Sequence, residues 1–184
     1  MSEMAKKEAL QVEAARRGEE YLATCRGCAP AVFAAVMDTL GHGDDAAARE
    51  VCKASVGLTG GTGFMSVGTC GAVAGGAMAV SYSFGYGRED LEEDVARTLA
   101  VNTAVAQLGK RVVERYGHIQ CQEIQFSHWG KSFRFTHPEA FAEFLAFCVD
   151  ERSGLKCQTL TGVVSGWAVE CILEHNPAFC RREK

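Results

Sequence analysis

Residues 57–76 read GLTGGTGFMSVGTCGAVAGG, and this stretch decides the fold. Its first twelve residues contain five glycines, which is too costly for a helix interior and marks tight backbone turns. From Cys70 onward the residues are small, and Gly71 and Gly75 stand four positions apart, so they share one helix face. The stretch therefore predicts a glycine-rich loop followed by a small-residue helix that another backbone can approach closely.

The rest of the chain also predicts helices, because apolar residues recur at helical spacing and little alternates like a strand. We expect an all-α, compact multi-helix bundle in one domain, residues 1–184. It would comprise an N-terminal amphipathic helix, a cysteine-bearing core and a tail, over residues 1–24, 25–175 and 176–184. Further helices are predicted at about 30–40, 44–54, 90–116, 138–148 and 155–174, with a turn after Cys121 and a loop or short ribbon over 127–136.

Two of these helices have predicted buried faces. The helix predicted at 30–40 would turn inward Val32, Phe33, Val36, Met37 and Leu40. The helix predicted at 90–116 would bury a stripe made of Leu91, Val95, Leu99, Val105, Leu108 and Val112. The long helix at 90–116 and the phenylalanine-rich segment after it offer more apolar surface than one small bundle needs. This favours a homodimer.

Composition excludes several classes of partner. The formal net charge is −4 and no basic cluster stands out, which argues against nucleic acid. Glycine and polar residues interrupt every apolar stretch before the roughly 20 residues that a membrane span needs. Charged residues follow Met1 where a secretory signal would have an apolar segment, so we expect a cytoplasmic protein.

Nine cysteines are an odd number, and thiols stay reduced in the cytoplasm, so a framework of disulfides is not expected. Four of them stand beside glycines or turns: Cys28, Cys70, Cys121 and Cys157. Amides at helix starts and turns favour thiolate, so this placement indicates redox or metal chemistry. Cys171, by contrast, shares an apolar helix face and is interpreted as a core residue.

Residues 25–28 read Cys-Arg-Gly-Cys at a predicted helix start. This spacing suits either a dithiol–disulfide pair or two metal ligands, and Arg26 would favour the thiolate. No histidine follows Cys28, so the attachment pattern of c-type haem is missing. One hypothesis is therefore a dithiol oxidoreductase in which Cys28 is the nucleophile and Cys25 or Cys70 the resolving thiol.

The glycine loop superficially resembles a nucleotide cradle. It lacks the Gly-Lys-Ser/Thr ending of a phosphate-binding loop, and no strand is predicted before it. The sequence therefore predicts no nucleotide.

With these residues assembled, the chain resembles the C_GCAxxG_C_C family of redox-active proteins. The residues that carry the resemblance are Cys28, the run Cys70-Gly71-Ala72-Val73-Ala74-Gly75, Cys121 and Cys157, and it covers about residues 20 to 175. The same core is similar to the non-haem part of split-Soret cytochromes c, which have been associated with an iron–sulfur centre. The haem-binding motifs of that group are missing here, so no haem is expected.

The resemblance implies a redox protein. In the leading hypothesis Cys28, Cys70, Cys121 and Cys157 converge and ligate an iron–sulfur cluster, beside Gly68, Gly71 and Gly75, and pass electrons to a partner protein. The alternatives are the dithiol oxidoreductase and a helical protein with a structural zinc ion held by cysteines.

Overall fold

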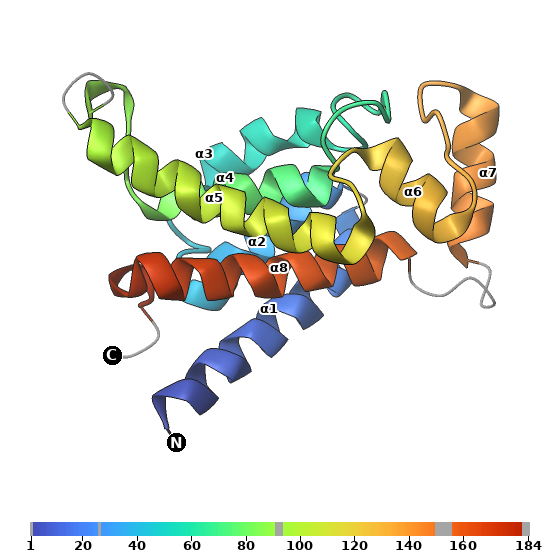
Figure 1. Cartoon of the computed structure of the whole chain (residues 1–184). Coiled ribbons are helices and arrows are strands. Elements are labelled where there is room, and N and C mark those ends of the chain that lie inside the picture. The colour runs from blue at the N-terminus through green and yellow to red at the C-terminus, as the bar shows by residue number, and fades with distance from the viewer. Residues whose placement is uncertain (1, 26, 91–93, 150–155, 182–184) are drawn as a thin grey trace.

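The computed structural model describes residues 2–25, 27–90, 94–149 and 156–181, and over these ranges the chain forms helices and no strand (Figure 1). The α-helices are α1 (Glu3–Cys25), α2 (Cys28–Leu40), α3 (Ala46–Ser55), α4 (Gly71–Ser83), α5 (Val95–Tyr116), α6 (Cys121–Trp129), α7 (Pro138–Val149) and α8 (Lys156–His175). Short 3-10 turns lie at Val56–Leu58, Arg88–Asp90 and Pro177–Phe179. The all-α prediction is confirmed.

The centre of the bundle consists of α2, α4 and α8, with α1 against α8 and α5 against α4 and α8 (Figure 1). The contact between α1 and α8 depends on small residues, which let the two backbones approach. A Cβ at Gly162 would lie 2.7 Å from the carbonyl oxygen of Ala15, and one at Gly166 would lie 3.0 Å from that of Gln11. Helix α8 therefore runs antiparallel to α1.

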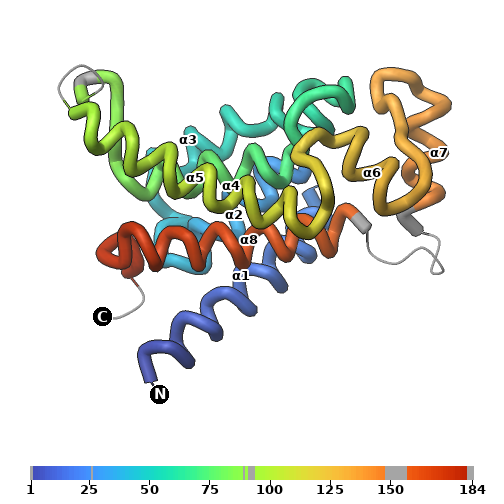
Figure 2. Tube along the Cα trace, in the orientation of Figure 1, coloured from blue at the N-terminus to red at the C-terminus, as the bar shows by residue number. Residues whose placement is uncertain are grey.

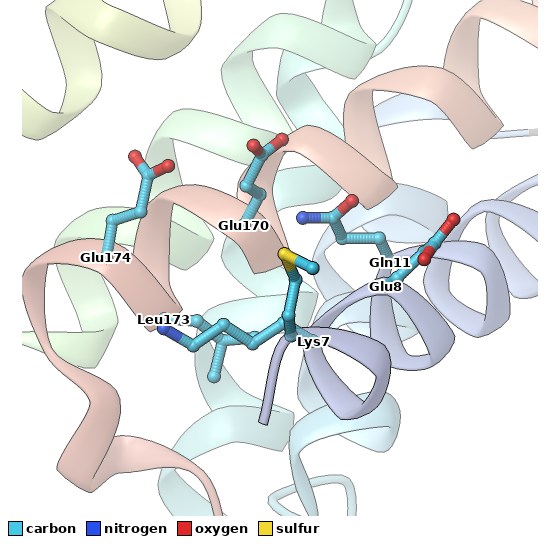
Figure 3. Close-up of a pocket in the computed structure, with 7 residues that line it drawn as sticks. Lys7, Glu8, Gln11, Glu170, Leu173 and Glu174 are labelled. Atoms are coloured by element: carbon cyan, nitrogen blue, oxygen red, sulfur yellow. The ribbon is translucent and has the colours of Figure 1, made fainter. Parts of the chain in front are cut away.

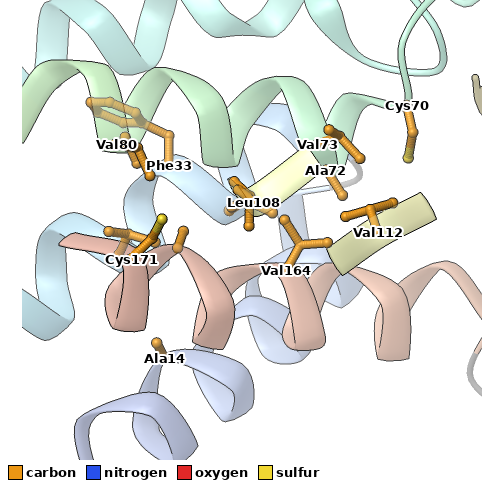
Figure 4. Packing of buried hydrophobic residues seen from close by; sticks show 14 of the residues in the cluster. Ala14, Phe33, Cys70, Ala72, Val73, Val80, Leu108, Val112, Val164 and Cys171 are labelled. Carbon is orange, nitrogen blue, oxygen red and sulfur yellow. The ribbon is translucent and has the colours of Figure 1, made fainter. Parts of the chain in front are cut away.

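The core is formed where these helices meet (Figure 4). The predicted inward face of α2 is confirmed, because all five residues on it are buried. On α5 the prediction was wrong in part, since Val95 and Leu99 are 75% and 67% exposed, while Leu108 and Val112 are buried. The helix begins at Val95, with its first turn capped by Asp94, and its buried residues lie from Ala104 onward. Leu91 lies outside the described residues.

The C-terminal tail returns to the end of α2. The ring of Phe179 stacks on the imidazole of His42 with centroids 3.8 Å apart, and the amide of Arg181 donates to the carbonyl of Leu40 at 3.0 Å. His42 also pairs with the carboxylate of Asp45 at 2.9 Å. The described ends of the chain lie on the same side of the molecule (Figure 2).

The segment after Cys121 differs from the sequence prediction. It forms helix α6 as far as Trp129, where Gly130 in a left-handed conformation (φ 69°) ends it. Only after that does the chain become irregular, and Phe133 and Phe135 turn inward onto α7. Aromatic rings then pack edge-on against one another, as between Phe135 and Phe144 with centroids 4.6 Å apart. This packing buries part of the phenylalanine-rich surface within the molecule.

Within the described ranges, no helix combines the length and the apolar character that crossing a membrane requires.

Candidate cysteine site

The glycine loop contains a short left-handed turn. Residues 60–64 all have positive φ, between 57° and 74°, and two of them, Thr62 and Phe64, are not glycine. The amide of Ser66 donates to the carbonyl of Gly60 at 2.9 Å and closes the turn. A residue with a side chain in this region costs about 1–2 kcal/mol. Such strain is held by surrounding contacts and concentrates at functional sites.

The loop is fixed to the start of α6. The amide of Cys121 donates to the carbonyl of Gly68 at 3.0 Å, and the amide of Cys70 donates to that of Ile119 at 2.7 Å. Between these two bonds lies an isolated antiparallel bridge from Thr69 to Gln120. Cys70 and Cys121 are therefore neighbours across a two-stranded contact, although they are far apart in the sequence.

Each of the sulfurs in question stands at a helix N-terminus. Cys28 is the first residue of α2, Cys70 is the N-cap of α4, and Cys121 is the first residue of α6. Unpaired amides and the positive end of the helix dipole meet at such positions, and both favour negative charge. The sulfurs of Cys28, Cys70 and Cys121 also lie close enough together to act on one another electrostatically.

Backbone amides point at the sulfur of Cys28. They come from Gly60 in the left-handed turn, from Cys28 itself and Ala29 at the start of α2, and from Ala72 in the first turn of α4. The loop and two helix N-termini thus supply donors to one sulfur. These donors lower the pKa of the thiol, but burial has the larger effect.

Burial raises the pKa of all three thiols. The pKa of Cys28 lies above its usual value, that of Cys70 well above it, and that of Cys121 at about 12. For Cys70 and Cys121 the negative charge of neighbouring thiols raises the pKa further. Amides at helix starts were expected to favour thiolate, and the amides are present, but removal of the thiols from water outweighs their effect on the pKa. Without a cation these sulfurs are neutral thiols at pH 7.

Gly71 and Gly75 bring α4 against the start of α2. A Cβ at Gly71 would overlap the sulfur of Cys28, and one at Gly75 would overlap the carbonyl oxygen of Ala29. The third predicted glycine, Gly68, lies in the loop, where a Cβ would come within 2.7 Å of the carbonyl oxygen of Gly61. Close approach explains all three glycines: Gly71 leaves room for a sulfur, and the other two leave room for backbone.

Cys157 lies at the second position of α8, so it too is near a helix N-terminus. Helix α8 runs in the same direction as α4, since Val164 packs at Gly76 and Asn176 donates to the carbonyl of Ser83. Cys157 precedes Val164 by two helical turns. This register puts Cys157 at the same end of the bundle as Cys70.

Cys25, the other predicted thiol, ends α1 and is exposed. Its sulfur lies 3.6 Å from the hydroxyl of Thr24, and its charge raises the pKa of Cys52 on α3. One interaction of Cys25 thus stays within α1 and the other reaches α3, whereas amides of the loop and α4 donate towards Cys28. Arg26, expected to favour the thiolate, lies outside the described residues.

Gln125 is a contact residue that the sequence analysis missed. It is buried in α6, one turn after Cys121, and its amide nitrogen lies 3.1 Å from the Cys121 sulfur. The only sequence signal is the spacing of four residues between a cysteine and a polar side chain on a helix. That signal is too common to single out one glutamine.

Other concave regions lie away from the sulfurs. A pocket of about 370 Å³ opens between α1 and α8, and carboxylates line much of it (Figure 3). Its lining consists of Met4, Lys7, Glu8, Gln11, Glu170, Leu173 and Glu174, with no cysteine. Among the described residues, no group of three or more Cys, His, Asp or Glu side chains is arranged as a site for a metal ion.

Comparison with known families gives one match. The family model described as "Putative redox-active protein (C_GCAxxG_C_C)" matches residues 27–171. The chain belongs to this family. The matched range includes Cys28, Cys70, Cys121 and Cys157 and excludes Cys25. No curated protein and no solved structure shows significant similarity to the chain.

Proposed function

We propose that the protein is an electron carrier in which Cys28, Cys70, Cys121 and Cys157 ligate an iron–sulfur cluster. The observation that carries the proposal is the arrangement of the first three: their sulfurs are neighbours, each at the N-terminus of a different helix. Three converging helix N-termini stabilise an anionic group, and thiolate-ligated clusters are anionic.

The chemistry of the donor set fits this group. Burial raises the pKa of all three thiols, and amide donors point at each of the three sulfurs. Their raised pKa values mean that the protons stay on until a cation replaces them, because a coordinating thiol is deprotonated outright. Bound there, the cluster would take up and release one electron at a time.

The chain's own groups would then set the conditions for that transfer. Amides of Gly60, Ala29 and Ala72 donate towards the Cys28 sulfur and would stabilise the negative charge that builds up on reduction. The left-handed turn lies against Cys121, since a Cβ at Gly61 would come within 2.9 Å of the Cβ of Cys121, and Cys70 and Cys121 are both 7% exposed. Hydrogen bonds to sulfur and exclusion of water are the two means by which proteins adjust cluster potentials.

A second candidate is dithiol chemistry between Cys28 and Cys70. It is favoured by the position of the Cys28 sulfur directly against Gly71, the residue that follows Cys70. Against it, a reactive cysteine needs an accessible sulfur with a lowered pKa, and burial raises the pKa of both thiols. The cluster is therefore the better-supported proposal.

Anaerobic purification, followed by reconstitution with iron and sulfide, tests the proposal. We expect a brown protein with stoichiometric iron and sulfide and visible absorption that bleaches on reduction. A colourless protein with one equivalent of zinc would contradict it and favour a structural site. A colourless, metal-free protein that forms a Cys28–Cys70 disulfide would contradict it in favour of dithiol exchange.

A further inference from the structure

Gln125 joins the Cys121 sulfur to the segment that follows α6. Gln125 is 1% exposed, so both ends of its side-chain amide need partners inside the protein. The side-chain nitrogen Nε2 donates to Cys121 Sγ at 3.1 Å, and the side-chain oxygen Oε1 accepts from the backbone amide of Phe133 at 3.0 Å. One buried amide therefore links a sulfur and a backbone N–H.

The direction of this amide is fixed by chemistry. A backbone N–H can only donate, so the oxygen of Gln125 must face Phe133 and its NH₂ group must face the sulfur. Phe133 is in turn held to the glycine loop, because Ser66 Oγ donates to its carbonyl at 2.6 Å. Turning the amide over would place two donors together at Phe133 and leave the carbonyl oxygen against the sulfur.

We propose that Gln125 is a positioning residue that supplies a fixed N–H donor to the Cys121 sulfur and raises the reduction potential of the redox centre there. This inference rests on the proposed function. When the centre takes one electron from a reductant, negative charge on its sulfurs increases, and a donor that already points at Cys121 stabilises the reduced form more than the oxidised form.

Contacts with the glycine loop give Gln125 a second role, which is to hold the start of α6 in place. The chain of contacts runs from Cys121 through Gln125 and Phe133 to Ser66, whose carbonyl accepts from the amide of Gln122 at 2.8 Å. This closed circuit holds the first turn of α6 against the left-handed turn. Gln125 thereby also holds the sulfur of Cys121 in one direction.

The test compares Gln125→Met and Gln125→Glu with a control, Gln122→Met, in the reconstituted full-length protein. Gln122 lies beside the site, but its side chain contacts Glu123 rather than a sulfur. Gln125→Met keeps the volume and removes the donor. Gln125→Glu keeps an acceptor for Phe133 and the shape of the side chain, but places an acidic group against the sulfur.

We expect Gln125→Met to shift the reduction equilibrium about tenfold towards the oxidised form, which is about 59 mV for a one-electron couple. Gln125→Glu should lower the potential increasingly as the pH rises and its carboxyl ionises, while Gln122→Met keeps the wild-type value. Wild-type potentials in both Gln125 variants would overturn the proposal.

A measurement on the metal-free protein separates this inference from the proposed function. Iodoacetamide alkylates Cys121 when its thiolate displaces iodide, so loss of the donor should slow the reaction about tenfold in Gln125→Met. If Gln125 only filled space, a methionine of similar volume would leave the alkylation rate of Cys121 at the wild-type value, which would contradict the proposal. If the wild type failed to bind iron, the proposed iron–sulfur cluster would be refuted. The alkylation rate of Cys121 would still test whether Gln125 donates to its sulfur.

Discussion

Two buried cysteines lie at opposite ends of the same core, Cys70 at the start of α4 and Cys171 in the last turns of α8 (Figure 4). Their exposed fractions are similar, 7% and 3%, and burial raises the pKa of both. Their partners differ. The Cys171 thiol donates to the carbonyl of Ala104 at 3.1 Å and also receives the backbone amide of Leu108, whereas Cys70 faces amide donors and two further sulfurs.

The comparison shows that burial does not separate a structural thiol from a candidate ligand. The two thiols differ instead in the carbonyl that accepts from Cys171 and in the two sulfurs that neighbour Cys70. A thiol that donates to a carbonyl is satisfied in its protonated form, and removing the proton would set a thiolate against an oxygen. A sulfur that receives N–H groups is suited to carry negative charge once a cation has replaced its proton.

The largest expected effect comes from Gly75, which tests whether the cysteine end depends on backbone contact. Replacing it by alanine would place a Cβ on the carbonyl oxygen of Ala29, and backbone cannot move aside as a flexible side chain can. We expect Gly75→Ala to lower the free energy of unfolding by about 3 kcal/mol or more. Urea denaturation of the metal-free protein measures this.

Gly109 on α5 provides the matched control, because nothing lies within 4 Å of a Cβ built there. Gly109→Ala should stabilise the protein by about 0.5–1 kcal/mol through helix propensity alone. If the two variants had the same stability, the close approach of α4 to α2 would be refuted.

A smaller effect is expected on the free energy of unfolding at alkaline pH, where the buried thiol of Cys121 contributes. The folded protein holds the pKa of Cys121 at about 12, against an ordinary value of 9.0. Below pH 9 this thiol is protonated in both states, and its contribution to stability is complete. Above pH 9 the unfolded thiol ionises first, so stability falls as pH rises towards the folded pKa.

Metal-free wild type should therefore lose about 1 kcal/mol more stability between pH 9 and pH 10 than Cys121→Ala does. Urea denaturation at the two pH values gives the slopes. Equal slopes would show that the sulfur of Cys121 is not buried as described.

Much of this fold follows from the sequence, and the exceptions have physical causes. The face of α2 was predictable because five apolar residues repeat at helical spacing. Helix α6 was not, because Cys121–Trp129 mixes polar and aromatic residues and its position depends on bonds to the loop at Ser66 and Gly68. On α5 the apolar residues predicted the helix, but they did not predict which part of it is buried against other helices.

The positions of the candidate cysteines could be predicted from the sequence, their role as ligands stays a prediction, and their surroundings were less predictable. The positions of Cys28, Cys70 and Cys121 beside glycines and turns indicated the cysteines that the fold brings together. The dominance of burial over the amides, and the role of Gln125, depend on distances between segments that local pattern does not contain. For the same reason no pattern predicted Thr62 in a left-handed conformation.

The central claim, that Cys70 is a ligand and Cys171 a core thiol, is tested most directly by alanine variants at these two positions. Each would be reconstituted anaerobically, and bound iron, sulfide and visible absorption would be measured beside the wild type. The account predicts that Cys70→Ala loses the chromophore and most of its iron. Cys171→Ala should keep both, with stability lowered by about 1 kcal/mol. Full iron binding by Cys70→Ala, or its loss in Cys171→Ala alone, would contradict the account.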